Sequence, residues 1–404
     1  MFSAKVHLMH ILFVTGYYKP AYVYGGPTKS LATLCAGLVT HGAHVTVFTT
    51  NANGRQRLDV PLGTPVMVDG VAVSYFPLCY QGLGFFYAPA MAQSLPDQIA
   101  RSDLVVIESI WGYQLLLAAR QCLKQRKPYI IAVRGQLFAW SLRHQRLKKK
   151  LYLHLLGKRY LQHAAALYCT DAQEAAAVAR LGLGPPLFVV PNSIDTTPFA
   201  QMPVRGFWRH QYGITEEAIV LLYLGRLTQI KRPDIAVATL AACRERHADV
   251  HLILAGPDQD QMAVRLQAQA HSLGCLNYMH LTGALDPEQV RQVLADADLL
   301  IAPSVIQENF GLSTAEALAA GVPVLTSPGI PVGQLAEAWQ AGRVAACTVE
   351  AFQHAAQAMI TKPAELIALG RNGRLLAKAV FDVAAVVPQM LTHYSAIIER
   401  RLLS

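Results

Sequence analysis

The 404-residue sequence lacks the features that mark several common classes of protein. Its seven cysteines are scattered without a CxxC pair, which argues against a zinc site and a disulfide framework and fits a reducing compartment. No apolar run reaches the roughly 18 residues that a membrane span needs. Residues 1–9 contain one Lys and no long apolar stretch, so we expect no signal peptide. These absences together predict a cytoplasmic protein.

Acidic residues are scarce in the first half of the chain. Residues 1–192 carry 19 Lys and Arg against 7 Asp and Glu, whereas residues 193–404 carry 16 against 19. The first half therefore accounts for the positive sign of the formal net charge, which is +9. This asymmetry predicts an anionic partner for the first half. No basic groove with interleaved aromatic residues is apparent, so we do not expect that partner to be nucleic acid.

Alternating strand and helix patterns are present in both halves. Hydrophobic residues make up 53% of the chain, which is enough core material for two domains of about 190 residues. A strand at residues 10–15, a helix at 28–40 and a strand at 45–49 predict a βαβ unit and hence a parallel sheet. Further strands are expected at residues 71–76, 104–107, 129–133, 166–169, 188–190, 220–224, 251–255, 279–282, 299–302 and 324–326. The predicted fold class is α/β, with two doubly wound, Rossmann-like domains that bind ligands at the carboxyl ends of their strands.

The break between the two halves is expected near Pro191, after the last strand of the first half. We therefore expect an N-terminal domain at residues 1–192 and a C-terminal domain at residues 193–375. Residues 376–404 are predicted to be helical and to pack back on the N-terminal domain, with Phe381 and Pro388 marking a bend.

The segment from residue 297 to 321 is predicted to form a strand, a loop and a helix. The loop and the helix carry two carboxylates, Glu308 and Glu316. A helix N-terminus suits phosphate, and a carboxylate beside phosphate would repel it, so these two acids are better placed to hold hydroxyls. Phosphate combined with hydroxyls indicates a nucleotide sugar. A capped surface helix with two solvated acids remains the alternative for this segment alone.

Two further segments fit a phosphate ligand. Gly25 and Gly26 follow the first strand and precede a helix, where glycine lets the backbone approach a ligand closely; a flexible turn is the alternative. Arg226 and Lys231 lie on a loop at the carboxyl end of a strand, where they could bind a diphosphate and stabilise the charge of a leaving nucleotide. A solvated basic loop is the alternative reading of this second segment.

These motifs, in this order, resemble the motif set of the GT4-type glycosyltransferases, which have the GT-B fold. The resemblance rests on Gly25-Gly26, on Gly225-Arg226 with Lys231, on Ala255–Asp258, and on Glu308–Gly311 with Glu316. The spacing of Glu308 and Glu316 matches the E-x7-E motif of that family. The resemblance extends over about residues 9 to 400, and its second-half motifs are specific as a set.

The resemblance implies a retaining, metal-independent hexosyltransferase that uses a nucleotide-diphosphate sugar and needs no cofactor. By position, Arg226 and Lys231 would bind the diphosphate, Glu316 the ribose hydroxyls and Glu308 the sugar hydroxyls. The remaining donor contacts would come from Gly25, Gly26, Leu285, Asn309, Phe310, Gly311, Leu312 and Ser313. Leu285 falls where such enzymes contact the base.

The first half departs from the family pattern at the place where many relatives have a sugar-contacting His. Arg134 stands there, and an arginine cannot act as a general base. In a front-face reaction the leaving phosphate can accept the proton, so no protein base is required. Arg134 would then bind phosphate or an anionic acceptor, or it would be a structural arginine that ties a loop. Glu108 and Trp111 are the other candidates for acceptor contact.

Residues 143–160 form a basic stretch that is predicted to be an amphipathic helix. Leu147, Leu151, Leu155 and Tyr152 fall on one side, with cations elsewhere. Such a helix suits the anionic surface of a membrane, and it fits a lipid-linked acceptor and a peripheral position on the cytoplasmic face of the inner membrane. The alternative is a helix whose apolar side faces the core and whose basic side is solvated.

The resulting hypothesis is the transfer of a hexose from a UDP- or GDP-sugar to a glycan or lipid-linked acceptor, in the synthesis of a cell-surface polysaccharide. Three alternatives remain open at this point. A nucleotide-sugar epimerase of the same fold would need no acceptor, a partner subunit would bind the donor without catalysis, and a simple sugar phosphate could be a soluble acceptor.

Overall fold

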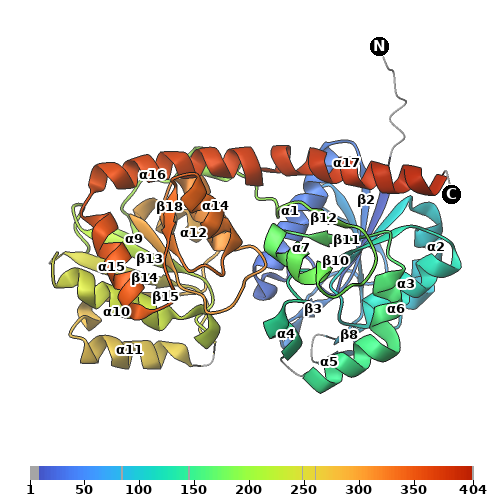
Figure 1. The fold of residues 1–404 in the computed structure, drawn as a ribbon, viewed down its shortest axis with the longest axis horizontal. Coiled ribbons are helices and arrows are strands. Elements are labelled where there is room, and N and C mark those ends of the chain that lie inside the picture. Colours follow the sequence, from blue (N-terminus) through green and yellow to red (C-terminus); the bar gives the residue numbers. More distant parts are fainter. Residues whose placement is uncertain (1–8, 83–84, 144–145, 248, 260, 403–404) are drawn as a thin grey trace, which may run out of the picture. The chain divides into compact units, whose positions relative to one another are not determined.

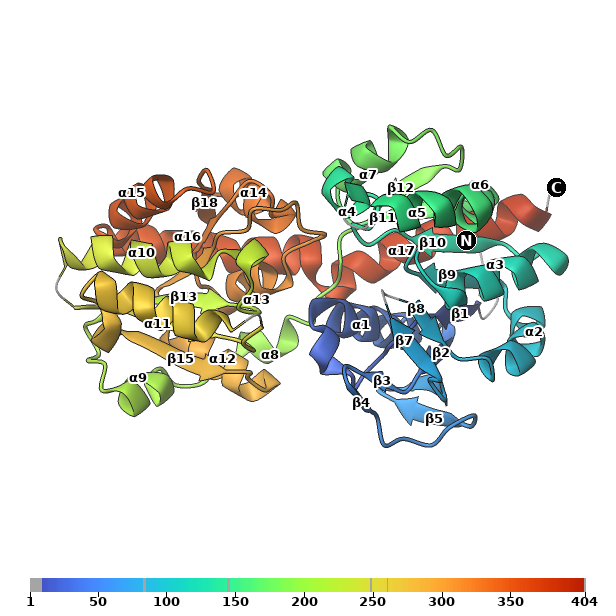
Figure 2. The same ribbon diagram turned by 90° about the horizontal axis from the view of Figure 1, so that it is seen from below.

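The computed structural model describes residues 9–82, 85–143, 146–247, 249–259 and 261–402. The chain divides into two compact units, the first comprising Met1–Ser193 and Val383–Ser404 and the second Ile194–Asp382. The second unit extends beyond residue 375 because Leu376, Ala377 and Phe381 belong to its hydrophobic core. Figures 1 and 2 label the elements of both units.

The first unit is built on an eight-stranded sheet with the order β12-β11-β10-β9-β1-β2-β6-β5. Its strands are β1 (His10–Val14), β2 (His44–Thr50), β5 (Pro65–Val68), β6 (Val71–Phe76), β9 (Leu104–Glu108), β10 (Tyr129–Ala132), β11 (Ala166–Cys169) and β12 (Leu187–Val189). All neighbours pair in parallel except β5, which runs antiparallel to β6 at the edge. Two hairpins, β3 (Ala52–Asn53) with β4 (Gln56–Arg57) and β7 (Tyr80–Gly82) with β8 (Phe85–Tyr87), extend from the unit.

Helices cover both faces of the first sheet, which explains why central strands such as β9 are buried on both sides. The helices are α1 (Gly26–Thr40), α2 (Met91–Arg101), α3 (Tyr113–Lys124), α4 (Ala139–Arg143), α5 (Arg146–Tyr152), α6 (Lys158–Gln162), α7 (Ala172–Ala179) and α17 (Val383–Leu402). The C-terminal helix α17 lies beside α1 and shares one hydrophobic cluster with it (Figure 1). A side chain at Gly37 would come within 2.5 Å of Val383, so glycine permits this close approach.

The second unit contains a six-stranded parallel sheet with the order β15-β14-β13-β16-β17-β18. Its strands are β13 (Ile219–Leu224), β14 (Val250–Ala255), β15 (Met279–Gly283), β16 (Leu299–Ala302), β17 (Val324–Thr326) and β18 (Gly342–Val344). The strand order reverses between β13 and β16, and such a switch point is where doubly wound sheets bind ligands.

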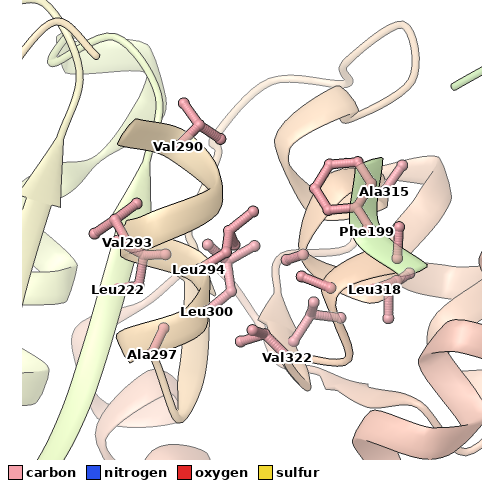
Figure 3. Packing of buried hydrophobic residues seen from close by; sticks show 14 of the residues in the cluster. Phe199, Leu222, Val290, Val293, Leu294, Ala297, Leu300, Ala315, Leu318 and Val322 are labelled. Atoms are coloured by element: carbon pink, nitrogen blue, oxygen red, sulfur yellow. The ribbon is translucent and has the colours of Figure 1, made fainter. Parts of the chain in front are cut away.

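Helices again cover both faces of this second sheet (Figure 2). They are α8 (Thr197–Ala200), α9 (Phe207–Tyr212), α10 (Pro233–Arg244), α11 (Met262–Ser272), α12 (Pro287–Asp296), α13 (Leu312–Ala320), α14 (Pro331–Ala338), α15 (Val349–Ile360) and α16 (Pro363–Leu376). One cluster joins α10, α11 and α15 to one face of the sheet, and another joins α12 and α13 to the opposite face. Figure 3 shows this second cluster, in which side chains of α12 gather around Leu222 of β13 and Leu300 of β16. This packing fixes α12 and α13 against the two strands that flank the switch point.

The segment predicted to be one bent helix at residues 376–404 comprises, over its described residues, the end of α16, a π-helical turn and α17. After α16, a π-helical turn at Ala377–Phe381 leads to an extended residue, Asp382, where α17 begins. The break therefore lies next to Phe381, whereas α17 continues through Pro388. Among the helices that the structure describes, none has the length and the apolar character that crossing a bilayer requires.

Candidate functional site

The switch point of the second sheet is hollowed into a pocket at the carboxyl ends of β13 and β16. The pocket is lined by Tyr223, Leu224, Gly225, Lys231, Ile301, Ala302, Ser304, Glu308, Ser313, Thr314 and Ile330. Its wall thus combines the loop after β13, the loop after β16 and the start of α13. An apolar base with a few convergent polar groups is typical of a small-molecule site.

The loop after β13 is held by backbone contacts with the loop after β14. Leu227 donates its N–H to the carbonyl of Pro257 at 3.0 Å, and the Tyr223 hydroxyl donates to the carbonyl of Arg226 at 2.8 Å. Gly256 has a φ of +145°, and a Cβ there would lie 2.1 Å from the carbonyl oxygen of Gly225. The motif Ala255–Asp258 therefore serves to let these two loops approach each other.

The loop after β16 is fixed from two sides. Ser304 receives a hydrogen bond from Ser327 and donates its N–H back to that hydroxyl, at 2.7 and 2.9 Å. The N–H of Val305 contacts the carbonyl of Ile230 at 3.1 Å, which links this loop to the one after β13. The N–H of Glu308 donates to the carbonyl of Gly329 at 2.8 Å. The backbone that carries Glu308 is thus held in place.

Lys231 and Glu308 form an ion pair across the pocket. The Nζ of Lys231 lies 2.6 Å from Oε1 of Glu308, and the two side chains are 27% and 11% exposed. The sequence analysis predicted that Lys231 binds phosphate and that Glu308 binds sugar hydroxyls. It did not predict that the two side chains bind each other. Arg226, the other predicted diphosphate ligand, lies on the same loop and is exposed, and its Nη1 donates to Oε1 of Gln259 at 3.3 Å.

The start of α13 supplies hydrogen-bond donors to the pocket. Gly311 precedes the helix with a φ of +100° and offers no side-chain cap, so the first-turn N–H groups have no helical partner. Ser313 and Thr314 line the pocket. The hydroxyl of Thr314 is buried and has no hydrogen-bond partner among the described residues. Thr314 was missed in the sequence because a threonine near a helix start resembles an ordinary capping residue.

Several other predicted donor residues are not among those that line this pocket. Glu316 is half-buried on the first turns of α13, and Leu285 packs partly against the core that holds this helix. The ring of Phe310 is buried against Phe381, 5.3 Å between centroids, so only its backbone is available to a ligand. Gly25 and Gly26 mark the start of α1 in the first unit.

Glu108 and Arg134, two predicted acceptor residues, bind each other in the first unit. They follow the neighbouring strands β9 and β10 and form a two-bond contact of 2.7 and 2.9 Å. The third nitrogen of the guanidinium, Nη1, donates to the side chain of Asn192. Burial by itself would lower the pKa of Arg134, but Glu108, Tyr168 and Glu174 together outweigh burial and raise the pKa. Both side chains are at most 10% exposed, so the geometry favours the structural alternative.

Trp111, the remaining acceptor candidate, lies on the loop after β9. Its indole N–H is buried and without a hydrogen-bond partner in the described part of the chain. The ring lies against Tyr152, with 5.6 Å between centroids, and the ammonium of Lys149 lies 5.3 Å from its centre. Gln136 ties this loop to the one after β10 by accepting from the Ser109 hydroxyl at 3.0 Å.

The basic segment forms α5, a π-helical turn at Leu153–Gly157, and α6. Leu147, Leu151 and Leu155 are 83%, 60% and 64% exposed. The alternative that these leucines face the core is therefore wrong, because Tyr152 packs inward against Trp111 and turns them outward. The helix exposes an apolar row beside its lysines.

Two family models match the chain in succession. Residues 25–193 match the glycosyl transferase 4-like domain, and residues 204–376 match the glycosyl transferases group 1. The chain belongs to the GT4-type glycosyltransferases. The resemblance inferred from the sequence motifs is thereby confirmed. The GT4-type models cover both units, which the motif set had also indicated.

Curated relatives and solved structures agree with this membership. A GDP-mannose-dependent alpha-(1-6)-phosphatidylinositol dimannoside mannosyltransferase from Mycobacterium tuberculosis is 27% identical over 272 residues, 66% of each chain. A D-inositol 3-phosphate glycosyltransferase from Actinosynnema mirum is 32% identical over 155 residues, 36% of this chain and 37% of the relative. The chain thus spans between about a third and two thirds of the curated relatives that it matches.

The fold of this GT4-type chain is also that of solved enzymes. HepE from Anabaena, in complex with UDP and glucose, superposes with a TM-score of 0.75 at 20% identity, over 96% of this chain and 100% of that one. This likeness confirms the predicted GT-B fold of two Rossmann-like domains.

Proposed function

We propose that the chain transfers a hexose from a UDP- or GDP-sugar to a glycan or lipid-linked acceptor, in cell-surface polysaccharide synthesis. The observation that carries this proposal is the pocket at the ends of β13 and β16, where a cation, a carboxylate and the start of a helix converge. A helix start with an unpartnered, buried hydroxyl suits a phosphate group, and a carboxylate suits hydroxyls. A nucleotide sugar offers both kinds of group in one molecule.

The roles in the donor site follow from the chemistry of each group. Arg226 and Lys231 bind the diphosphate and stabilise the charge that develops on it as the sugar leaves. The N–H groups of Leu312 and Ser313 and the hydroxyl of Thr314 contact a phosphate oxygen at the start of α13. Contacts to the rest of the donor come from Glu308 to the sugar hydroxyls, Glu316 to the ribose, Leu285 to the base, and the backbone of Asn309, Phe310 and Gly311 beside the sugar.

The reaction needs neither a metal nor a protein base in this proposal. Arg226 and Lys231 neutralise the negative charge of the diphosphate, which a divalent metal ion would otherwise do. The leaving phosphate accepts the proton of the attacking hydroxyl, which approaches the sugar from the same face. The configuration at the anomeric carbon is then retained. Transfer should therefore persist in excess EDTA, and the product should keep the α configuration of a UDP-α- or GDP-α-hexose donor in an NMR assay.

The acceptor side rests on Trp111 more than on Arg134 and Glu108. Because each nitrogen of the Arg134 guanidinium donates to Glu108 or Asn192 and both members of the ion pair are buried, we propose that this pair positions the loops after β9 and β10 and does not touch substrate. Trp111 presents an indole N–H that lacks a partner among the described residues, which suits an acceptor hydroxyl or phosphate oxygen.

Relatives support a UDP- or GDP-linked hexose as donor. The Mycobacterium tuberculosis relative is GDP-mannose-dependent, and HepE was solved with UDP and glucose. The test is a thermal-shift panel of UDP, GDP, UDP-glucose and GDP-mannose, since a ligand that binds the folded state alone raises the unfolding temperature. We expect one nucleotide and its sugar to stabilise the protein. If no member of the panel raises the unfolding temperature, the proposed donor class is wrong.

Two other functions of the same donor site are separable by experiment. An epimerase would change the donor sugar without an acceptor, so donor incubated alone would yield an isomeric nucleotide sugar. A partner subunit without catalytic function would bind the donor and transfer nothing.

We expect Glu316→Gln mainly to weaken donor binding and Glu308→Gln mainly to lower turnover; small and equal effects of both would contradict the assigned roles.

A second proposal concerns the exposed leucines of α5 and of the π-helical turn that follows it. We propose that Leu147, Leu151 and Leu155 enter the interface of an anionic membrane while the neighbouring lysines contact its phosphates, as a lipid-linked acceptor would require. The support is the exposure of all three leucines next to the exposed Lys148 and Lys150. A basic segment near an anionic surface gains about 1 kcal/mol per Lys or Arg, and the buried apolar area adds to this.

Co-sedimentation with vesicles tests this contact. The wild type should sediment with phosphatidylglycerol-containing vesicles and not with phosphatidylcholine alone, and replacing the three leucines with serine should release it. Leu375→Ser is the matched control, because Leu375 is 62% exposed in the second unit. Equal sedimentation of the triple-serine variant and the control would contradict the proposal.

A further inference from the structure

The ion pair of Lys231 and Glu308 occupies the place where the donor diphosphate is proposed to bind. Both side chains line the pocket, and their charged atoms are 2.6 Å apart. The lysine side chain is 27% exposed and the glutamate side chain 11%, so water screens the pair less than it would on the open surface. In this state the cation is already neutralised by a carboxylate of the protein itself.

A diphosphate that binds Lys231 would come close to the carboxylate of Glu308. Phosphate oxygens and the Glu308 carboxylate carry the same sign of charge, and close approach of like charges is unfavourable in a partly buried site. The backbone of Glu308 is held by its bond to Gly329, and the preceding loop is held through Ser304 and Ser327. With the backbone held in this way, freeing the cation requires the side chain of Glu308 or that of Lys231 to turn away.

The displaced carboxylate then needs new hydrogen-bond donors, because a buried charge without partners is costly. A nucleotide sugar supplies them as the hydroxyls of its hexose. A nucleoside diphosphate, the product that remains after transfer, supplies none at this position. The pocket should consequently hold the donor more readily than the spent nucleotide, although both carry the same diphosphate.

We propose that Glu308 is a specificity-determining residue that competes with the diphosphate for Lys231, so that the pocket distinguishes the nucleotide sugar from its nucleoside diphosphate product. This inference rests on the proposed donor site. When sugar is bound, Glu308 turns to its hydroxyls and Lys231 is free for the phosphates. When the sugar has left, Glu308 returns to Lys231 and promotes release of the nucleotide.

Titration calorimetry with UDP and UDP-glucose, or with GDP and GDP-mannose, tests the inference on the full chain. In Glu308→Gln the carboxylate charge is lost, so the nucleoside diphosphate should bind roughly tenfold more tightly, the gain from one charge-assisted contact. The nucleotide sugar gains the freed cation but loses its charged hydroxyl acceptor, so its affinity should change less than about threefold. Product inhibition by the nucleoside diphosphate should strengthen in parallel while turnover falls.

Asp234→Asn is the matched control. Asp234 pairs with Arg232 at 2.7 Å on the neighbouring part of the chain and does not line the pocket. This variant tests whether the loss of any carboxylate near Lys231 strengthens binding of the nucleoside diphosphate. We expect the ratio of its affinities for the nucleoside diphosphate and the nucleotide sugar to equal that of the wild type.

The outcomes separate this inference from the proposed function. If neither nucleotide nor nucleotide sugar binds the wild type, the donor site itself is wrong. If both bind but the ratio of affinities in Glu308→Gln stays within threefold of the wild type, or Asp234→Asn shifts the ratio equally, the competition is refuted and the donor site stands. Glu308→Ser replaces the glutamine variant if the latter does not show the wild-type unfolding temperature without ligand.

Discussion

Each unit contains a carboxylate and a cation at the carboxyl ends of two neighbouring strands, and the two pairs differ in almost every other respect. In the first unit, Glu108 and Arg134 follow β9 and β10 and are joined by two hydrogen bonds. In the second unit, Lys231 and Glu308 lie on the loops after β13 and β16 and are joined by a single contact of 2.6 Å. The first pair is at most 10% exposed, whereas the lysine of the second is 27% exposed.

The difference shows how similar residue types at similar places acquire different uses. Each nitrogen of the planar guanidinium of Arg134 donates to Glu108 or Asn192, and the side chain is only 10% exposed, which leaves little access for an additional ligand. The ammonium of Lys231 is a compact charge with further donors to spare, and it faces a pocket. The first pair is therefore suited to holding loops, and the second to exchanging one partner for another.

The largest expected effect comes from breaking the buried pair. Glu108→Ala leaves the guanidinium of Arg134 buried without its carboxylate, which should lower the free energy of unfolding by about 3–5 kcal/mol. Urea denaturation measures this loss. Glu365→Ala is the control, since it breaks the more exposed pair with Arg343 and should leave the urea midpoint unchanged. Equal urea midpoints for Glu108→Ala and Glu365→Ala would contradict the prediction that the buried pair contributes more to stability than the exposed pair.

Breaking the pair of Lys231 and Glu308 should lower activity and leave stability almost unchanged. Lys231→Ala removes a cation from the proposed diphosphate site and should lower kcat/KM roughly 100-fold, about 2.7 kcal/mol of transition-state stabilisation. The urea midpoint should barely move, because a partly exposed pair contributes little to folding. Steady-state kinetics and denaturation on the same preparation check both parts. A large loss of stability with unchanged kcat/KM would reverse the roles that we assign to the two pairs.

A smaller effect is expected on the pH dependence of stability, through a histidine that belongs to neither ion pair. The Nε2 of His280 lies 3.0 Å from the Nδ1 of His251, and the ring of His280 stacks on Tyr212. Two charged groups lie close by. The carboxylate of Asp249 is 3.2 Å from His251, and the guanidinium of Arg244 lies over the ring of Tyr278. Burial, reinforced by His251, lowers the pKa of His280 to about 4. As the pH falls from about 6.5 towards 4, the unfolded chain binds a proton that the folded chain does not, so stability falls across this window.

The loss at His280 should amount to about 1–2 kcal/mol once the partial exposure of the ring is considered. His280→Phe keeps the stacking on Tyr212 and should flatten the dependence of the urea midpoint on pH between 6.5 and 4.5. His354→Phe, at an exposed position on α15, should leave that dependence as it is in the wild type. If the two variants have the same pH profile, the histidine pair does not account for the effect.

The sequence was informative wherever a local pattern determines the structure. The strands of both sheets lie where the apolar runs predicted them, with two exceptions. They are β5, an edge strand of four partly exposed residues that begins with Pro65, and β18, whose three residues Gly342–Val344 are too short to form such a run. The loop and helix around Glu308 were also predicted, because Gly311 and Gly321 mark the two ends of α13.

What the sequence could not provide were contacts between residues far apart in the chain. The pairing of Lys231 with Glu308 depends on β13 and β16 being neighbours, which no local pattern reveals. The same holds for Arg134, whose two alternatives were separable only once Glu108 lay on the adjacent strand. Whether the leucines of the basic segment face solvent or the core was left open, because helical periodicity shows which residues share a side and not which side is buried.

The central claim is that the pocket at the ends of β13 and β16 holds the diphosphate of a nucleotide sugar through Lys231. The most direct test is calorimetric titration of UDP-glucose and GDP-mannose into the wild type and into Lys231→Ala. We predict that the wild type binds one of the two sugars and that the variant binds the same sugar at least about tenfold more weakly. Binding of equal strength to both proteins would contradict the claim.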